Sequence, residues 1–476
     1  MDITDVNFFT HVNDLRSGGV LDIYSKRWFE CHKNLVSINL YLHRNSEMMD
    51  TIGDERIDAL MRKFETLVRE LITTYFVRFI HTEELTKCTK DKILEQEIGG
   101  SELQTINGDG KNGGDTTTEN RISSYISLYH EVTLLNIVER ILCADHAYDK
   151  INNHMINLFA YIYSNLVAFL KSNSEEYFSK PISEMSISEM LIEENDKSQN
   201  IDRLKIYMCV INALRNITDR IHLLNNTIIN KIVDYDVLLI LIPLLEKRPW
   251  EHGNYVFEGN EWVKREGNTL CTIEKQLWLI LYTLILTRNC QEKYEMTNYR
   301  RNNILKLRKY MNEPLHEQLP PMKTLHTFIE HLYISKSIFP ENKNSYLIID
   351  VVPEIFEEIK EDVLKNKKKL ASLLSTVTID RALLGGISDM YLSVYEFDQQ
   401  GGKGAKNDTG GGPHSRDQKG TDYKRGEAVT EESFLCDSCK EIAELQCSQC
   451  KRAYYCSKEC QMKDWFHHRQ VCSYVT

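Results

Sequence analysis

Residues 57–75 read IDALMRKFETLVRELITTY, and this stretch indicates the fold class of most of the chain. Its apolar side chains recur at steps of three and four residues, at Ile57, Leu60, Met61, Phe64, Val68, Leu71, Ile72 and Tyr75. This spacing puts them on one face of an amphipathic α-helix that packs against a core. The same pattern fills residues 122–143, 201–224, 273–286, 304–311 and 325–334.

The predicted fold class is therefore all-α. Residues 230–250 have a polar start, an apolar helix at 237–245 and the ending EKRPW. Helix pairs of this kind are typical of an armadillo- or HEAT-like helical solenoid, in which each pair buries one face against its neighbours. Because no clean repeat period is present, an irregular helical body is the alternative. One short β-hairpin is expected, with strands at 255–257 and 262–263 around Gly259-Asn260.

Glycine marks two breaks in the helical pattern. Of the 22 glycines, six lie between residues 99 and 114 and eight between 401 and 426, in stretches poor in apolar side chains. We expect a disordered insertion at 99–120, an acidic loop at 173–200 and a flexible linker at 398–433. The predicted domains are a helical body at 1–397 and a cysteine-rich module at 434–476.

Charge and hydropathy exclude several classes of protein. The 476 residues carry a formal net charge of −11, which argues against a general binder of nucleic-acid phosphates, because such binding needs clustered Lys and Arg. The first five residues, MDITD, lack the basic and apolar character of a secretion signal. The longest apolar runs, 237–245 and 277–286, are about half of the ~20 residues that a membrane span needs. We expect neither a nucleic-acid nor a membrane partner.

Seven of the thirteen cysteines crowd into residues 436–472. The pattern is Cys436-x2-Cys439-x7-Cys447-x2-Cys450-x5-Cys456-x3-Cys460-x7-His468-x3-Cys472. Eight such ligands in four pairs are the number that two tetrahedral zinc sites require. His468 is preferred to His467 because it lies four residues before Cys472, on the same face of a helix. The six cysteines outside this cluster are predicted to be buried thiols: Cys31, Cys88, Cys143, Cys209, Cys271 and Cys290.

These zinc sites are expected to be structural, and no catalytic residue is predicted. Four protein ligands per ion leave no position open for a reactive water. Because the module contains so little apolar material, we expect it to fold only with metal. Spacing alone allows the four pairs to be shared between the ions in sequence order or in an interleaved order.

The module resembles the MYND zinc finger. The resemblance is carried by the eight ligands and by Tyr454, Tyr455, Gln461 and Trp465. It implies interleaved binding, with one zinc on Cys436, Cys439, Cys456 and Cys460 and the other on Cys447, Cys450, His468 and Cys472. It also implies a protein-binding module, in which a groove for a short proline-containing peptide is lined by Ser448, Gln461 and Trp465. Packing inside the finger is the alternative role of Trp465.

The helical part has a resemblance of its own. The strings that carry it are LLEKRPW (244–250), FEG (257–259) before Trp262, QLW (276–278), ILKLR (304–308), QLP (318–320), VPEI (352–355), and Trp28, His32, Leu35 and Asn39. In order and spacing these are similar to the family of zinc finger MYND domain-containing protein 10, over most of 20–100, 120–360 and 434–474.

This second resemblance implies a non-enzymatic adaptor that acts in preassembly of axonemal dynein arms for motile cilia or flagella. The implied partners are a leucine-rich-repeat dynein assembly factor, a heat-shock chaperone with its co-chaperones, and axonemal dynein chains as clients. The implied location is the cytoplasm, with the centrioles or the ciliary base as a second place.

Two other classes compete with this interpretation. A SET-domain methyltransferase with an inserted finger needs an Asn-His-x-Cys element, and the nearest string, at 153–157, lacks the cysteine. A nuclear MYND-type transcriptional co-repressor adaptor is the alternative function, but the only basic run, at 365–369, lies in a helical pattern typical of a solvated face. Trp250 and Trp262 are expected to pack a corner of the body, and His32 to be a packing or surface residue.

Overall fold

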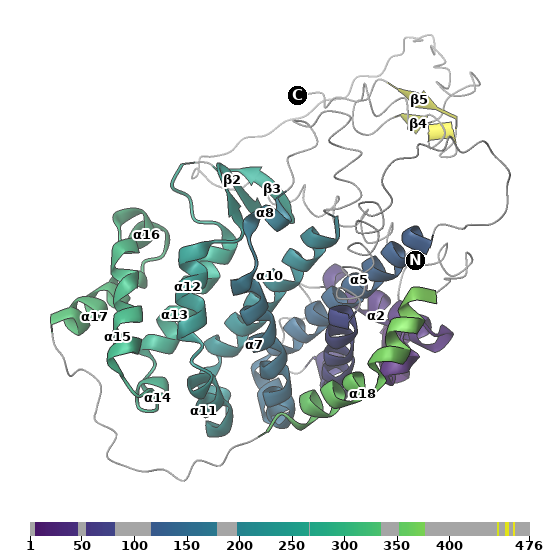
Figure 1. The fold of residues 1–476 in the computed structure, drawn as a ribbon, viewed down its shortest axis with the longest axis horizontal. Coiled ribbons are helices and arrows are strands. Elements are labelled where there is room, and N and C mark those ends of the chain that lie inside the picture. Colours follow the sequence, from purple (N-terminus) through teal and green to yellow (C-terminus); the bar gives the residue numbers. More distant parts are fainter. Residues whose placement is uncertain are drawn as a thin grey trace, which may run out of the picture. The chain divides into compact units, whose positions relative to one another are not determined.

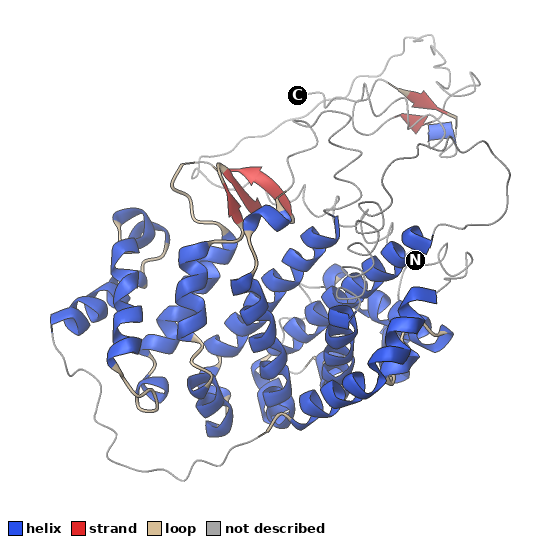
Figure 2. Ribbon diagram, in the orientation of Figure 1, coloured by secondary structure: helices blue, strands red, loops and turns tan. Residues whose placement is uncertain are grey.

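A computed structural model describes residues 5–45, 54–80, 116–178, 198–265, 267–334, 352–376, 445–446, 453–456 and 460–461. The chain divides into two compact units, Met1–Ala405 and Lys406–Thr476. The described residues of the first unit are mostly helical, which confirms the predicted all-α class (Figures 1 and 2). The predicted domain boundaries at 397/398 and 433/434 lie outside the described residues and stay predictions.

The helices of the first unit begin and end as follows. The N-terminal part contains α1 (Asp5–Asp14), η1 (Val20–Asp22), α2 (Lys26–Arg44), α3 (Glu55–Met61), a helix at 64–80, α5 (Thr116–Leu142), η3 (Asp145–Ala147), α6 (Tyr148–Ile151), η4 (Asn152–His154), α7 (Met155–Lys171) and α8 (Ser174–Tyr177). The remainder contains α10 (Ser198–Asp219), η6 (Ile221–Leu223), α11 (Asn226–Asp234), α12 (Leu238–Lys247), α13 (Thr272–Leu286), α14 (Arg288–Gln291), α15 (Asn298–Leu305), η7 (Lys306–Tyr310), α16 (Glu313–Gln318), α17 (Met322–Ile334) and α18 (Glu354–Thr376).

These helices pack on one another nearly in chain order. Helix α2 packs on α5, α5 on α10, and α10 on both α7 and α13. Helix α12 packs on α7 and α13, and α17 packs on α13 and α15. The colours of Figure 1 therefore pass from purple to green across the stack. From α2 to α17 the arrangement is solenoid-like, because each helix buries its apolar face mainly against near neighbours.

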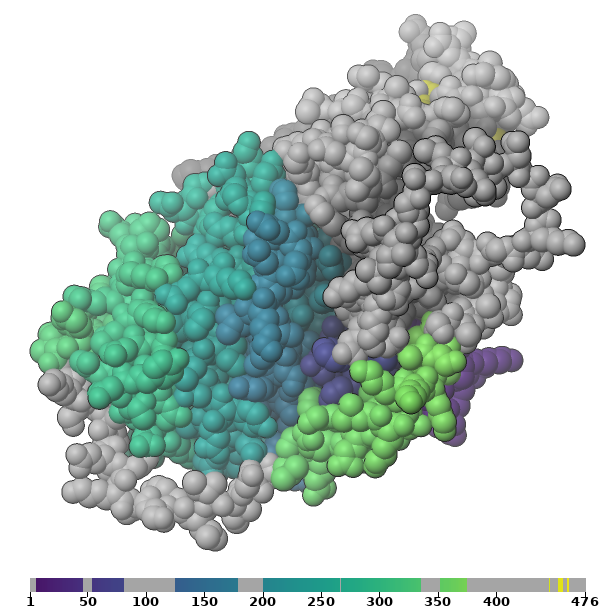
Figure 3. Space-filling model, viewed as in Figure 1, coloured from purple at the N-terminus to yellow at the C-terminus, as the bar shows by residue number. Residues whose placement is uncertain are grey.

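Helix α18 makes the body irregular, because it packs on η1, α5 and α7 rather than on α17. The space-filling view shows its light green surface beside the purple and blue of the N-terminal helices (Figure 3). The buried backbone N–H of Phe356 donates to Oδ1 of Asn157 at 3.2 Å. The ring of Phe356 lies 5.0 Å from that of Phe76, and Glu358 pairs with Arg69 at 3.1 Å. Contacts between residues far apart in the sequence thus pack α18 against the N-terminal helices.

Some helix boundaries differ from the predictions. The predicted helix at 57–75 is interrupted by a turn at 62–63. In that turn Lys63 Nζ donates to the backbone carbonyls of Asn13 and Leu15, at 2.8 and 3.1 Å, at the C-terminal end of α1. The stretch 304–311 is the end of α15 followed by the 3-10 helix η7. Residues 116–120, predicted as disordered, lie in α5, whereas 99–115, most of 173–200 and the linker at 398–433 lie outside the described residues.

The predicted hairpin is present as part of a three-stranded sheet. Strands β1 (Glu251–His252), β2 (Tyr255–Glu258) and β3 (Glu261–Lys264) are antiparallel, and Phe257 pairs with Trp262. Gly259 and Asn260 have φ of 58° and 68°, which is the left-handed backbone that a two-residue hairpin turn needs. The predicted packing role of Trp250 and Trp262 is confirmed by their burial.

A buried polar cluster joins α2, α5 and the helix at 64–80. Trp28 Nε1 donates to Glu70 Oε1 at 3.0 Å, and His130 Nε2 lies 3.3 Å from the same oxygen. Nδ1 of His130 is 2.9 Å from Nδ1 of His32, and both imidazoles are fully buried. His32 is therefore an internal residue with a polar partner, a contact that its helical spacing alone does not reveal.

A second buried group lies one layer further along the stack. Arg78 Nη2 donates to Glu131 Oε1 at 2.9 Å and to Asn165 Oδ1 at 3.3 Å. The hydroxyl of Tyr161 donates to the same carboxylate at 2.8 Å. Removing one partner of such an ion pair leaves a buried charge without compensation, which is strongly destabilising. These contacts therefore fix the relative orientation of α5, α7 and the helix at 64–80.

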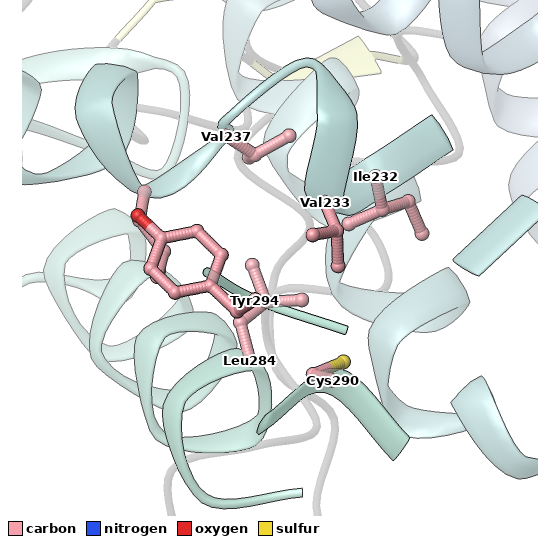
Figure 4. A pocket seen from close by; sticks show the side chains of 7 residues that line it. Ile232, Val233, Val237, Leu284, Cys290 and Tyr294 are labelled. Carbon is pink, nitrogen blue, oxygen red and sulfur yellow. The ribbon is translucent and has the colours of Figure 1, made fainter. Parts of the chain in front are cut away.

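A small cavity lies among the later helices of the body. A cavity of about 10 Å³ is enclosed by α11, α12, α13 and the turn after α14, with Cys290 and Tyr294 at one side (Figure 4). That volume is at most one water molecule. No helix in the described ranges is both long and apolar enough to cross a membrane.

The buried imidazole of His32 gives a prediction about pH. Burial lowers the pKa of His32 well below its ordinary value, and His130 adds to this shift. The unfolded chain takes up this proton near pH 6.5, whereas the folded chain does not, so the unfolded state binds more protons below that pH. The free energy of unfolding should therefore fall by about 1.4 kcal/mol per pH unit as the pH drops below about 6.5.

Urea denaturation at pH 7.5 and 5.5 measures this effect. His32→Asn keeps a polar group near Nδ1 and should lose the His32 part of the pH slope, while His331→Asn, at an exposed position on α17, should keep it. If the free energy of unfolding depended on pH equally in His32→Asn and in the unchanged chain, His32 would not be the source of the effect.

Candidate metal centre

Two of the predicted zinc ligands lie close together. Sγ of Cys456 lies 3.5 Å from Sγ of Cys460. Two thiolates on one tetrahedral zinc, each about 2.3 Å from the ion, lie about 3.8 Å apart, whereas a disulfide joins its sulfurs at about 2.0 Å. The pair therefore fits half of a zinc site and not a disulfide. Cys460 and Gln461 are helical, and Cys456 lies in a bend directly after β5.

A short hairpin precedes this pair. Strand β4 (Leu445–Gln446) and strand β5 (Tyr454–Tyr455) are antiparallel, with Leu445 opposite Tyr455 and Gln446 opposite Tyr454. Cys456 directly follows β5, and Cys447 directly follows β4 in the sequence. Because the strands are antiparallel, the chain leaves β4 and β5 at opposite ends of the hairpin.

The direction of the strands also bears on how the ligands are shared. The chain enters β4 at the end of the hairpin where it leaves β5 toward Cys456. In the sequence, the knuckle Cys436-x2-Cys439 precedes β4 with five residues between them. The connection between the strands, which carries Cys447 and Cys450, belongs to the other end. This topology favours the interleaved order over the sequential one.

Most of the predicted site lies outside the described residues. This applies to the ligands Cys436, Cys439, Cys447, Cys450, His468 and Cys472 and to the groove residues Ser448 and Trp465. Of the predicted groove, Gln461 is described, and its side chain is partly buried directly after Cys460. The ligand sets and the groove therefore stay predictions.

The cysteines of the body differ from this pair. Cys271 and Cys290 are buried as predicted, but Cys31 and Cys209 are only partly buried and Cys143 is exposed, so the prediction of buried thiols is wrong for Cys143. Cys143 follows the last turn of α5, where apolar spacing no longer decides burial. Cys88 lies outside the described residues.

Burial keeps the thiols of Cys209 and Cys290 protonated. It raises the pKa of Cys209 to about 12 and that of Cys290 to about 11, whereas a zinc ligand must be a thiolate. No group of three or more His, Cys, Asp or Glu side chains with metal-site geometry occurs among the described residues. The described part of the body thus offers no competing metal site to the finger.

Comparisons with known proteins found similarities to the finger and to the longer chain. The family model described as MYND finger matches residues 436–472. The chain is 25% identical over 370 residues to the zinc finger MYND domain-containing protein 10 homolog of Drosophila melanogaster, across 73% of this chain and 77% of that protein. It is 48% identical over 40 residues to Tudor domain-containing protein 1 of Mus musculus, across 8% of this chain and 3% of that protein.

A third relative, programmed cell death protein 2 of Mus musculus, is 50% identical over 42 residues, across 9% of this chain and 12% of that protein. No solved structure matches the chain. The short matches cover about the length of one finger, whereas the Drosophila match needs the helical body as well.

These findings define the class first: a helical-body protein with a zinc-binding MYND finger near its C-terminal end. They also confirm the second resemblance given by the sequence. The long match and the finger together support membership of a family like that of zinc finger MYND domain-containing protein 10. A MYND finger implies protein binding, so the candidate site is one for interaction with another protein.

Sequence reasoning found the ligand pattern but missed the β4–β5 hairpin. Two residues per strand are too few for a visible alternation of apolar and polar side chains. The one available signal was Tyr454-Tyr455, a pair of residues favoured in strands.

The Cys456–Cys460 pair gives a prediction about zinc. Cys456→Ala removes one of four ligands, so the purified chain should contain less zinc than the unchanged chain and its finger should unfold locally. The body should keep its helical circular dichroism and its melting temperature, because α2 to α17 are held by helix packing.

The matched control is Cys143→Ser, which changes an exposed cysteine on the body and should keep the zinc content measured by a colorimetric chelator. Equal zinc content in Cys456→Ala and Cys143→Ser would remove Cys456 from the site.

Proposed function

We propose that this chain is a non-enzymatic adaptor for the preassembly of axonemal dynein arms, needed for motile cilia or flagella. The supporting observation is the extent of the similarity to the Drosophila relative, 73% of this chain and 77% of that protein. A finger at residues 436–472 is far too short to produce it. The proposal therefore rests on the body and the finger together.

The partners proposed on this resemblance are a leucine-rich-repeat dynein assembly factor, a heat-shock chaperone with co-chaperones, and axonemal dynein chains as clients. The place of action is the cytoplasm, with the centrioles or the ciliary base as a second location. We propose no enzymatic step, no nucleic acid and no membrane partner. The comparisons name no enzyme, which supports the first of these points.

In this proposal the body and the finger bind different partners. The helical stack provides a large, rigid surface for a client or chaperone, and the finger binds a partner peptide. The predicted linker of about 35 residues would span roughly 30–35 Å on average if flexible. Such a linker raises the concentration of one bound partner near the other without any new contact.

We propose two structural zinc ions in the finger. One is held by Cys436, Cys439, Cys456 and Cys460, and the other by Cys447, Cys450, His468 and Cys472. The 3.5 Å approach of Cys456 and Cys460 and the direction of β4 and β5 support this interleaved order. When bound, zinc supplies the cross-links that so short a segment lacks in apolar packing.

The peptide groove is proposed at Ser448, Gln461 and Trp465. Gln461 and Trp465 are four residues apart, one turn on a helix, so an amide and an indole face lie on the same side. An indole face holds a proline ring and the amide bonds one peptide group, which is the chemistry of proline-containing motifs.

Affinity purification of the tagged chain from ciliating cells tests the proposed class. We expect axonemal dynein chains and heat-shock chaperones in the eluate, and immotile axonemes without dynein arms in cells that lack the chain. A matched eluate from the His468→Ala chain should lose the partners of the finger but keep those of the body. Chromatin proteins in the eluate, with normal dynein arms in cells lacking the chain, would instead support the nuclear co-repressor adaptor.

Trp465→Ala tests the groove separately. The substitution should weaken capture of the finger's partner by roughly 30-fold, the effect of losing one buried aromatic anchor. Zinc per chain should not change, because no ligand is removed. Unchanged capture, measured by pull-down at several partner concentrations, would assign Trp465 to packing inside the finger.

A further inference from the structure

Strand β3 of the body has a free edge, on the side away from β2. The strand order of the sheet is β1-β2-β3, so β3 pairs on one side only (Figure 1). The backbone N–H of Arg265, directly after β3, donates to the carbonyl of Asn254 at 2.8 Å. Because backbone groups alternate along an antiparallel strand, those of Val263 also point to β2, whereas those of Trp262 and Lys264 point to the free edge.

The backbone N–H groups on this edge are unpaired within the described part of the chain. No hydrogen bond joins the backbone N–H of Trp262 or Lys264 to another described residue. A row of unpaired backbone groups at a sheet edge is a template for pairing with another strand. The edge also faces water, since Glu261, Val263 and Lys264 are all exposed. Strand β3 is therefore accessible to a strand from another chain.

The side chains of β3 match a second copy of the same strand. When two β3 strands pair antiparallel through the groups that face the edge, Trp262 pairs with Lys264 of the second copy. Val263 then lies opposite Val263 of the second copy, on a two-fold axis. The next position places Glu261 opposite Arg265 of the second copy. An acidic side chain thus meets a basic one, and an apolar side chain meets its own kind.

Glu261 is the side chain of β3 that gains most from this arrangement. Within the hairpin it lies opposite Glu258, and like charges at opposed positions destabilise a sheet. Glu258 accepts a hydrogen bond from the backbone N–H of Thr272 at 2.8 Å, whereas Glu261 has no ion pair among the described residues. A guanidinium on the other side of Glu261 would supply the opposite charge.

The surroundings of Arg265 permit a carboxylate to approach. Arg265 pairs with Glu251 at 2.5 Å and with Glu274 at 3.2 Å. Arg248 pairs with the same two carboxylates, at 3.2 and 3.0 Å. Two arginines and two glutamates have no net charge together, so this group does not repel Glu261 of a second copy.

Val263 is the apolar centre of the contact. It is 37% exposed and is one of the larger apolar side chains of the described body that remain exposed. A valine opposite a valine at close range is a favourable pair of β-branched side chains in an antiparallel sheet. Burial of both would remove apolar surface from water at the two-fold axis.

We propose that β3 pairs with β3 of a second copy of this chain, so that two three-stranded sheets become one continuous sheet. Each pair of Trp262 with Lys264 exchanges two backbone hydrogen bonds. Because the contact is small, the dimer belongs to the weak, reversible class. The inference uses neither the finger nor the proposed function, so each can fail without the other.

The first test traps the contact covalently in the full-length chain, with Cys143→Ser as background to remove an exposed thiol. Opposed Cα atoms at a non-hydrogen-bonded position are about 4.5 Å apart, within the range of a disulfide. Val263→Cys should therefore form a covalent dimer on mild oxidation, seen on a non-reducing gel and lost with reductant. In the matched control Glu261→Cys, the two new thiols sit on Cα atoms about 14 Å apart and should not join.

The second test removes a backbone donor from the free edge. Lys264→Pro deletes the outward N–H but leaves the hydrogen bonds to β2, and proline is tolerated on an edge strand. Association measured by sedimentation over a concentration series should weaken roughly 5- to 150-fold, because two hydrogen bonds per dimer are lost. Lys264→Ala keeps the N–H and should stay close to the unchanged chain. Equal association in both variants would show that the contact lies elsewhere.

The outcomes separate a second copy from other occupants of the edge. If the chain stays monomeric and Val263→Cys forms no more covalent dimer than Glu261→Cys, the exposed charges of β3 keep the edge unpaired and the inference is wrong. It is also wrong if the chain stays monomeric but Lys264→Pro loses a protein from the affinity eluate that Lys264→Ala retains, since the edge then pairs with that protein. The cysteine variants decide the question even where Lys264→Pro does not fold.

Discussion

A helix with one apolar face is stable in water only when a neighbour covers that face, and the body of this protein is built on that constraint. Helices α2, α5, α10 and α13 cover one another in succession. Helix α18 follows α17 in sequence but covers η1, α5 and α7, where Phe356 and the contact with Asn157 hold it. The polar clusters around Glu70 and Glu131 add orientation to this packing, because each buried group has a geometrically defined partner.

The finger is stabilised in a different way, because it has too few apolar side chains to form a core. Its 37-residue motif has few apolar side chains, and its described strands have two residues each. Zinc ligands in place of a core explain why the cysteines gather here. The cysteines of the body are scattered singly, and burial keeps the thiols of Cys209 and Cys290 protonated. The net charge divides in the same way, since the acidic excess belongs to the body. In the proposed function, the body binds a client and the finger binds a short peptide.

The sequence predicted the parts of the fold that depend on local pattern. Apolar spacing predicted α10, α13 and α17, and Gly259-Asn260 predicted the β2–β3 turn, because only a left-handed backbone fits there. The return of α18 and the His32–His130 contact were not predictable, since both join residues far apart in sequence. Cysteine spacing predicted eight zinc ligands for the finger, of which the structure describes Cys456 and Cys460. It left open how these ligands are shared between two ions, and it gave almost no signal for the pairing of β4 with β5.

The central claim is that helix packing stabilises the body and zinc stabilises the finger, each separately. Amide hydrogen exchange on the full-length chain, with and without a strong zinc chelator, tests it most directly. The account predicts that the chelator removes protection at Leu445–Gln446 and Tyr454–Tyr455 and leaves that of α2, α5, α10 and α13 unchanged. Protection that persists in the two strands after zinc removal, or that is lost throughout the body at the same time, would contradict it.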